Sequence, residues 1–263
     1  MRLTLRQRGL VPLLIAAAAL AVHACRRAPD GPPAPPDPAE PAAVRVSYDS
    51  KLSGVLPLML SRWTAAHPGA LARGISDTAG AIAGRAHAGT DDADLIVLTA
   101  QTPLPEGDRA PISVRPWAHD PLVIFTPPGE TRPLDEIIHD GGRLAMGVVA
   151  GPMGQYTRFG LRKIELWDAV KSHLIRHSDA ASVMNAVRDG SAAVGVVYSS
   201  DLARDPDGLR RVGVLDSAES ASREYVLVVL TPAGVPLARW IADPAQDDSL
   251  TSGGYLPLRP QSN

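Results

Sequence analysis

The sequence predicts an α/β fold in which mainly parallel strands are flanked by helices. Two regions, 43–99 and 141–201, each alternate short apolar runs typical of buried strands with stretches of helical spacing. A strand, a crossover helix and a second strand in this order favour a parallel sheet. About 220 residues follow residue 42, which is enough for two lobes of roughly 100 residues each.

The first 25 residues have the pattern of a secretory signal segment. Three arginines precede the apolar stretch 10–22, and Ala24 precedes Cys25, the only cysteine of the chain. The apolar stretch is too short to span a membrane. Residues 22–25 resemble a lipoprotein processing box, so we expect a lipid on Cys25 rather than ordinary cleavage after Ala24. The segment therefore predicts a periplasmic protein that is anchored to a membrane.

Residues 26–42 are predicted to form a semi-extended tether, because they contain seven prolines and no apolar periodicity. Removal of the signal segment takes away three arginines and changes the formal net charge from −2 to −5. The mature chain is then mildly acidic and offers no basic face for a nucleic acid. Nucleic-acid binding is therefore not expected.

Strands and helices are expected to alternate in the region that follows the tether. Ser50 or Ser53 is expected near the start of the first helix, and Pro57 is close enough to that start to be tolerated. Thr78 is placed to cap the second helix. The predicted order is strand, helix, strand, helix and strand, over 43–47, 52–63, 70–76, 78–88 and 94–99.

The segment 141–201 predicts a second unit of strands and helices. The apolar run 144–149 is typical of a buried strand, and a Gly-Pro-Met-Gly turn interrupts it directly before a helical stretch over 153–167. A helix therefore begins at the carboxyl end of a strand. Free backbone N–H groups at such a helix start can hold an oxyanion without a cation.

A further helix and strand complete this unit. Ser178 and Asp179 are good N-cap residues for a helix that ends near Gly190. The run 193–197 is another candidate for a buried strand. Tyr198 follows at its carboxyl end, where an open α/β sheet presents its ligand-facing loops.

The segment 141–201 resembles the second lobe of the periplasmic molybdate-binding proteins that serve ABC importers. The shared motifs are a GGRLA strand, a Pro-x-Gly turn, a Leu-x-x-x-x-Leu-Trp-Asp helix end and a Gly-x-Val-Tyr-x-Ser-Asp strand end, in this order. The resemblance implies an α/β, two-lobed fold of the type II periplasmic binding protein superfamily. It also implies that the protein is not an enzyme.

Two apolar stretches are expected to connect the lobes. Residues 120–126 would leave the first lobe and residues 224–230 would return to it, so that the two crossings form a hinge. In this division, lobe II contains 122–223, and lobe I contains 43–121 and 224–263. A ligand held between the lobes would favour a closed state.

The resemblance implies which residues bind the ligand. In this family an oxyanion is held by two hydroxyls of the first lobe, by backbone amides at two positions of the second lobe, and by a tyrosine hydroxyl. The second-lobe motifs place these groups at Met153, Ala180 and Tyr198. Backbone amides depend little on the side chain, so Met153 and Ala180 are tolerable at these positions.

The first lobe departs from the family pattern at both hydroxyl positions. One expected serine is replaced by Lys51, with Ser50 beside it, and the other is replaced by Ala79, with Thr78 beside it. We include all four residues in the predicted site. Residues 46–49 are instead similar to the opening of sulfate-binding proteins of the same superfamily.

Enzymatic and metal-binding motifs are missing from the sequence. It contains no Gly-x-Ser-x-Gly elbow, no phosphate-binding Gly-x-x-x-x-Gly-Lys-Ser/Thr loop, and no second cysteine for a zinc site. His173 and His177 lack a third ligand at a diagnostic spacing and are expected on the surface. Asp91, Asp92 and Asp94 are expected to form a solvated turn, with Asp94 at the start of a strand.

The sequence therefore predicts a monomeric, membrane-tethered binding protein that captures molybdate or tungstate and delivers it to an ABC permease. No cofactor and no resident metal are expected, since the metal would be bound only as its oxyanion. Two alternatives remain open. One is a binder of sulfate-type oxyanions, and the other is a sensor or interaction module that kept the fold but lost the ligand.

Overall fold

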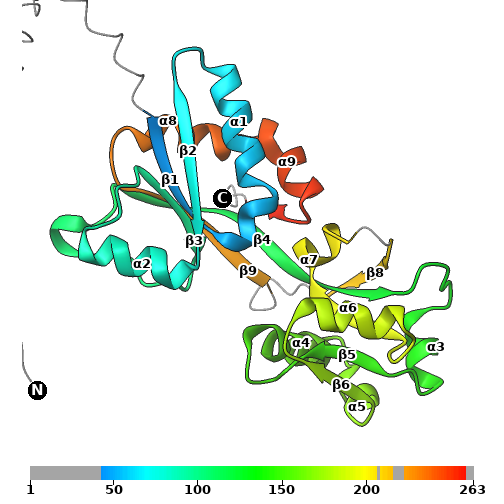
Figure 1. Cartoon of the computed structure of the whole chain (residues 1–263). Helices are drawn as coiled ribbons and strands as arrows, with labels where there is room; N and C mark the ends of the chain where they lie inside the picture. Colours follow the sequence, from blue (N-terminus) through cyan, green and yellow to red (C-terminus); the bar gives the residue numbers. More distant parts are fainter. Residues whose placement is uncertain (1–42, 206–207, 216–221, 259–263) are drawn as a thin grey trace, which may run out of the picture. The chain divides into compact units, whose positions relative to one another are not determined.

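The computed structural model describes residues 43–205, 208–215 and 222–258. They form an α/β fold with one mixed β-sheet and the helices that cover it (Figure 1). The strand order is β2-β1-β3-β9-β4-β7-β5-β6, and both β8 and β10 pair with β4. The signal segment, Cys25 and the tether lie outside the described residues. Within the described ranges, every helix is too short or too polar to cross a membrane.

The first half of the sheet follows the predicted order. Strands β1, β2 and β3 are parallel neighbours, with β1 in the middle. The bounds are β1 Ala43–Asp49, η1 Ser50–Gly54, α1 Leu56–Ala66, β2 Leu71–Asp77, α2 Ala79–Ala88, β3 Leu95–Thr99 and η2 Gly107–Arg109. The predicted strand and helix positions in this region are confirmed to within a few residues.

The predicted caps of the first helix are wrong. The Asp49 carboxylate accepts a hydrogen bond from the Lys51 amide at 2.9 Å, and this caps the short 3-10 helix η1. Helix α1 then begins separately at Leu56, with Pro57 in its first turn and no side-chain cap. Pro57 has no backbone N–H, so it fits the first turn of a helix but would disrupt its interior. This explains why α1 starts at Leu56 rather than at Leu52.

The second half of the sheet contains the predicted strand, helix, helix and strand, together with elements that were not predicted. Its bounds are α3 Leu134–His139, β5 Leu144–Gly147, α4 Pro152–Lys163, α5 Trp167–Val170, β6 Leu174–His177, α6 Ala180–Arg188, β7 Val194–Tyr198, α7 Ser199–Ala203 and β8 Arg210–Val214. The helix expected over 153–167 ends at Lys163, because Glu165 adopts φ 60° and breaks it. The connection between the two predicted helices contains strand β6.

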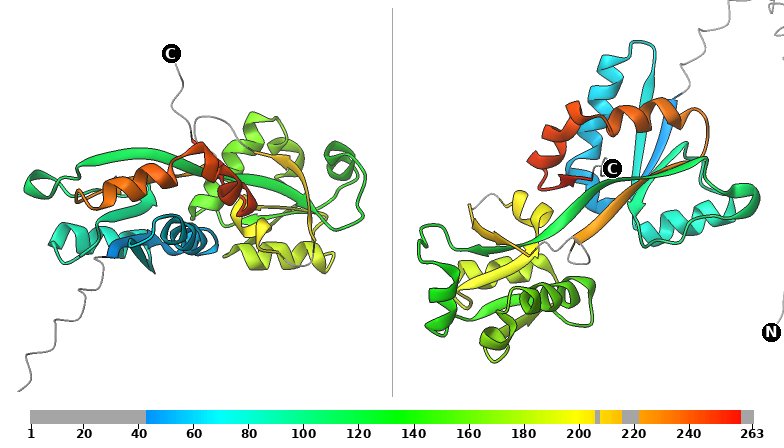
Figure 2. Two further views of the ribbon diagram at one scale, coloured as in Figure 1. Left: turned by 90° about the horizontal axis from the view of Figure 1, so that it is seen from above. Right: turned by 180° about the vertical axis from the view of Figure 1, so that it is seen from behind.

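A long strand, β4 (Ser113–Thr126), runs through both halves of the sheet (Figure 2). Its residues 113–121 pair with β9 (Ser222–Val229), and its residues 122–125 pair with β7. These pairings are antiparallel, so the sheet is mixed at its centre. The C-terminal elements are α8 Gly234–Ile241, η3 Pro244–Gln246, α9 Asp247–Ser252 and β10 Leu256–Pro257. The exact lobe boundaries stay a prediction.

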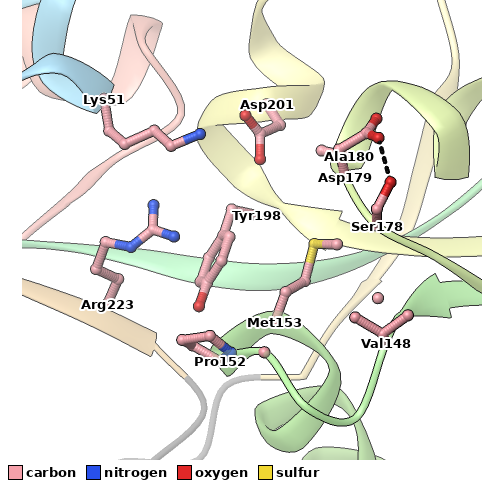
Figure 3. Close-up of a pocket in the computed structure, with 12 residues that line it drawn as sticks. Lys51, Val148, Pro152, Met153, Ser178, Asp179, Ala180, Tyr198, Asp201 and Arg223 are labelled. Carbon is pink, nitrogen blue, oxygen red and sulfur yellow. Dashed lines mark hydrogen bonds between the residues drawn. The ribbon is translucent and has the colours of Figure 1, made fainter. Parts of the chain in front are cut away.

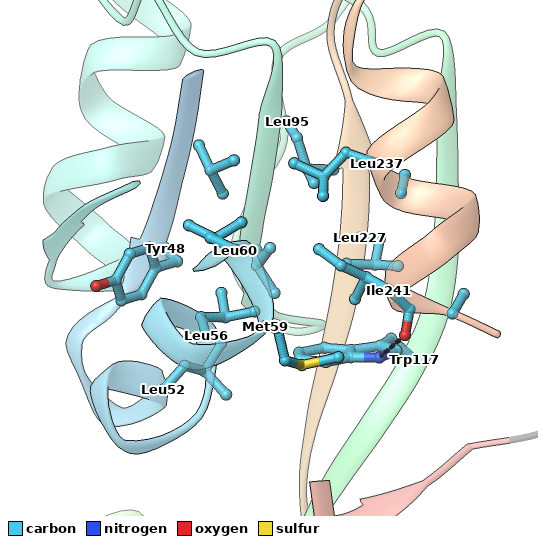
Figure 4. Close-up of a cluster of buried hydrophobic side chains, with 14 of the residues drawn as sticks. Tyr48, Leu52, Leu56, Met59, Leu60, Leu95, Trp117, Leu227, Leu237 and Ile241 are labelled. Atoms are coloured by element: carbon cyan, nitrogen blue, oxygen red, sulfur yellow. Dashed lines mark hydrogen bonds between the residues drawn. The ribbon is translucent and has the colours of Figure 1, made fainter. Parts of the chain in front are cut away.

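Helices cover both faces of each half of the sheet and enclose four apolar clusters. In the first half, α1 and α8 pack on one face and α2 on the other. Figure 4 shows the cluster between the sheet and helices α1 and α8, in which the Trp117 indole N–H donates to the Ile241 carbonyl at 3.2 Å. In the second half, α4 packs on one face and α6 on the other. Each half therefore has its own buried core.

The acidic loop before β3 is not a solvated turn, as was expected. The Asp91 side chain is buried and accepts hydrogen bonds from the Ser47 hydroxyl at 2.9 Å and the Ala93 amide at 3.0 Å. Asp94 is also buried and accepts from the Arg45 amide and from the Thr231 hydroxyl. These carboxylates join the start of β3 to neighbouring segments, and only the Asp92 side chain is largely exposed.

Candidate functional site

A cavity of about 230 Å³ lies at the carboxyl ends of strands β5, β6 and β7 (Figure 3). These strands are parallel neighbours, so the turns that follow them meet at one edge of the sheet. The cavity is lined by Lys51, Gly147, Val148, Gly151, Pro152, Met153, Ser178, Asp179, Ala180, Tyr198, Asp201 and Arg223. Its volume is well above the roughly 10–15 Å³ that a single water molecule requires, so a small ion has room.

Helix α4 begins at this cavity after a tight turn. Its N-cap residue is Gly151, which has no side chain that could cap the helix, and Pro152 is the first helical residue. The amides of Met153 and Gly154 lie in the first turn, where helix geometry provides no carbonyl partner. A side chain at Gly154 would collide with the carbonyl oxygens of Gly147 and Val148. The glycine therefore lets the helix start approach the end of β5.

Helix α6 brings a second helix start to the cavity. Asp179 is its N-cap, and one carboxylate oxygen accepts a hydrogen bond from the Ser182 amide at 2.8 Å. The hydroxyls of Ser178 and Ser182 donate to the other oxygen. The hydrogen bond from the Ser182 amide and those from the two hydroxyls hold the pKa of Asp179 below its usual value. The Ala180 amide remains in the first turn without a helical partner.

Tyr198 is the last residue of β7 and is 2% exposed. Its hydroxyl is buried and makes no hydrogen bond of acceptable geometry within the described part of the chain. Burial raises the pKa of this hydroxyl to about 12, so it stays protonated and can donate. A buried hydroxyl without a partner is costly, and a bound acceptor would satisfy it.

Arg223, near the start of β9, lies over the face of Tyr198, with its guanidinium carbon 3.9 Å from the ring centroid. Its Nη1 lies 3.7 Å from the buried carboxylate of Asp120. The Ser200 amide and hydroxyl donate to the two oxygens of Asp120 at 2.9 and 2.6 Å. Burial raises the pKa of Asp120 to about 6, against the opposing effects of the Ser200 hydrogen bonds and Arg223.

Lys51 reaches the cavity from η1, on the opposite side from Met153 (Figure 3). Its backbone carbonyl accepts from the Tyr255 hydroxyl at 2.7 Å and from Arg204 at 3.2 Å, which fixes this part of the chain. Asp201 also lines the cavity, but its carboxylate pairs with Arg204 at 2.6 Å. The cavity stays open with the side chains of both Lys51 and Met153 in place.

Four of the seven residues predicted to bind the ligand line this cavity: Lys51, Met153, Ala180 and Tyr198. The other three, Ser50, Thr78 and Ala79, are not among its lining residues. Thr78 caps α2 by accepting from the Ala81 amide at 3.3 Å, and Ala79 is the first residue of that helix. Ser50 is exposed in η1. A ligand role for these three stays a prediction.

Sequence reasoning missed Arg223 and Asp201 as lining residues. Arg223 immediately precedes the apolar run 224–230 that was assigned to a lobe crossing. A charged residue at such a crossing is the signal that could have identified it. Asp201 belongs to the Gly-x-Val-Tyr-x-Ser-Asp motif, but the motif alone does not show which way its carboxylate points.

Metal coordination has no support in the described residues, where no cluster of three or more histidine, cysteine, aspartate or glutamate side chains could hold an ion. His177 ends strand β6 and is half-buried, and its Nε2 has no hydrogen-bond partner in the described ranges. The expectation of an exposed surface pair is therefore wrong for His177.

The model of a family described as "Bacterial extracellular solute-binding protein" matches residues 44–255. The Bacillus subtilis protein named "Putative ABC transporter substrate-binding lipoprotein YvgL" is 25% identical over 128 residues, which is 48% of each protein. Molybdate-binding protein ModA of Haemophilus influenzae is 42% identical over 50 residues, 19% of this chain and 20% of that protein. The matched stretch is thus about half the length of the first relative and a fifth of the second.

A solved structure has a similar fold. It is described as the "substrate binding domain of putative molybdenum ABC transporter from Clostridium difficile" and superimposes with a TM-score of 0.73. The two sequences are 16% identical, and the match covers 82% of this chain and 99% of the other. At this identity the similarity establishes a common fold and no more.

Proposed function

The chain belongs to the bacterial extracellular solute-binding protein family, and we propose that it captures a tetrahedral oxyanion, molybdate or tungstate, for an ABC importer. Proteins of this family bind solutes and are not enzymes, so the chain is a binding protein. The relatives named as a molybdate-binding protein and as an ABC transporter lipoprotein support this choice of ligand and partner.

The observation that carries the proposal is the unpartnered hydroxyl of Tyr198 at a cavity formed by two helix starts. The hydroxyl and the first-turn amides of α4 and α6 are hydrogen-bond donors, and an oxyanion has only acceptor oxygens. Helix N-termini also carry partial positive charge, which favours an anion. Selectivity for molybdate over sulfate would come from cavity size, because the two ions share charge and geometry.

Membrane attachment through Cys25 is part of the same proposal. A lipid on Cys25 and the proline-rich tether would hold the binding unit near the permease in the periplasm. The lipoprotein name of the Bacillus subtilis relative supports this location. Mass spectrometry of the protein recovered from membranes would detect the lipid on Cys25, and an unmodified soluble form would contradict the anchor.

The first prediction concerns ligand identity. We expect molybdate and tungstate to raise the melting temperature of the purified protein more than sulfate or phosphate does. A ligand present at 1,000 times its dissociation constant stabilises the folded state by about 4 kcal/mol, which thermal denaturation detects readily. Isothermal titration calorimetry would then give the affinities. A larger effect of sulfate would favour a sulfate-type binder.

A second candidate function is an interaction module that has lost its ligand. The observation in its favour is that two carboxylates, Asp179 and Asp201, line the cavity, where they would repel a dianion. Both already accept hydrogen bonds from neighbouring groups, which reduces that repulsion. If none of the four ions changes the melting temperature, this second function replaces oxyanion transport.

A further inference from the structure

The cavity contains a positive charge that helix amides alone do not provide. Arg223 approaches from β9, and its guanidinium lies beside the Tyr198 ring (Figure 3). Only 19% of its side chain is exposed. A guanidinium stays ionised at any physiological pH and is weakly hydrated, so it can act as a partly buried cation.

The guanidinium still has hydrogen-bond donors available. The guanidinium carbon lies over the Tyr198 ring, 3.9 Å from its centroid, and a guanidinium carries five N–H donors. Nη1 makes no hydrogen bond in the described ranges, and the nearest Asp120 oxygen is 3.7 Å away, beyond normal hydrogen-bond distance. Asp120 instead receives two hydrogen bonds from Ser200. Asp120, Tyr198 and Tyr225 surround the guanidinium, and Nη1 forms a normal hydrogen bond with none of them, so this donor is available to a ligand.

We propose that Arg223 is an anion-binding residue of this site and that its charge makes the site prefer a doubly charged oxyanion over a singly charged one of the same shape. This inference rests on the proposed function. Amide and hydroxyl donors distinguish weakly between tetrahedral ions that differ only in charge. A fixed, partly desolvated cation distinguishes them more strongly, because the Coulomb attraction scales with the ligand charge.

Lys51 brings a second cationic side chain to the cavity. Its ammonium group also lines the cavity, but the residue is exposed. Solvent screening weakens the effect of an exposed charge on a neighbouring ion. Arg223 is therefore the residue expected to set the charge preference, and Lys51 is expected to contribute less.

The test compares tungstate with perrhenate, which are both tetrahedral and similar in size but carry two charges and one charge. Isothermal titration of the purified full chain should show at least about tenfold tighter binding of tungstate. In Arg223→Gln, the affinity for tungstate should fall by about 10- to 100-fold, the range expected for loss of a charge-assisted hydrogen bond. The preference over perrhenate should fall with it. Arg223→Lys, which keeps the charge, should retain the preference with weaker binding.

Arg115→Gln is the matched control, because it removes the same charge from an exposed position of β4 outside this cavity. Its affinities for both ions should equal those of the wild type. If the wild type binds tungstate and Arg223→Gln binds it equally well, only this inference fails. If the wild type binds neither ion, the proposed function fails as well. Should Arg223→Gln not fold, equal affinity of the wild type for the two ions would still overturn the inference.

Discussion

Some residues that line the cavity could be predicted from local sequence patterns, whereas Arg223 reaches the cavity only through the fold. Met153 and Ala180 line the cavity in the first turns of α4 and α6, and the start of a helix can be predicted from its cap and turn residues. Tyr198 follows from its place at the end of a buried strand. Arg223 reaches the cavity from a strand that is distant in the sequence, so no local pattern predicts its contact with Tyr198.

The hydroxyl of Tyr198 is predicted to donate a hydrogen bond to the bound anion. Tyr198→Phe removes one donor and leaves the ring that packs against Arg223. If the hydroxyl binds a buried anion, the affinity for molybdate should weaken by about 1 to 3 kcal/mol. The free protein should keep its stability or gain some, because the hydroxyl has no partner among the described residues.

Tyr156→Phe is the matched control, since Tyr156 lies in α4 but does not line the cavity. Titration calorimetry of both variants with molybdate would measure the effect. An affinity of Tyr198→Phe equal to that of the wild type would remove the hydroxyl from the binding site.

At the scale of elements, the sequence predicted the strands and helices with strong apolar patterns. Strands β1, β3, β5 and β7 and helices α2 and α6 were predicted within a few residues. The end of α4 was not, because the break at Glu165 requires an uncommon positive φ that the sequence does not signal. Strand β6 was missed because its residues are only half-buried and lack a clear apolar run.

The position of α4 depends on the absence of a side chain at Gly154. Gly154→Ala would force a side chain against the carbonyl oxygens of Gly147 and Val148, so the start of the helix must move away from β5. We expect a loss of about 1 to 3 kcal/mol in the free energy of unfolding, the usual range for overpacking. Anion binding should weaken too, because the Met153 and Gly154 amides move with the helix start.

Gly84→Ala provides the opposite case. Gly84 lies inside α2, and a side chain there would meet no atom within 4 Å. This change should stabilise the protein by about 0.5 to 1 kcal/mol, because alanine loses less backbone entropy than glycine in a helix. Urea denaturation would measure both variants. Equal stability of Gly154→Ala and the wild type would contradict the close approach of α4 to β5.

At the scale of the whole molecule, β4 and β9 connect the two halves of the sheet, and a buried polar group lies at their junction. Asp120 is in β4 and fully buried, Ser200 follows β7, and Arg223 is in β9. The sequence predicted that the chain crosses near 120–126 and 224–230, from apolar runs alone. It did not predict that Asp120 contacts Ser200 and Arg223, because these residues are far apart in the sequence.

Asp120 should make the stability of the folded protein depend on pH. Burial raises its pKa from 3.8 to about 6, so the folded protein binds this proton more tightly than the unfolded chain does. The stabilisation is therefore fully present below pH 3.8 and is lost as the pH rises through about 6. A shift of about two pKa units corresponds to at most about 3 kcal/mol. Asp120→Asn cannot ionise, so it should lose this contribution to the pH dependence.

The measurement is the free energy of unfolding of the wild type and Asp120→Asn between pH 4 and pH 7. Other carboxylates titrate in both proteins, so the difference between the two curves isolates Asp120. The wild type should lose stability relative to the variant as the pH rises. Asp108→Asn, an exposed change of equal charge, should produce no such trend. A constant difference for Asp120→Asn would mean that the carboxylate ionises as easily in the folded protein as in the unfolded chain.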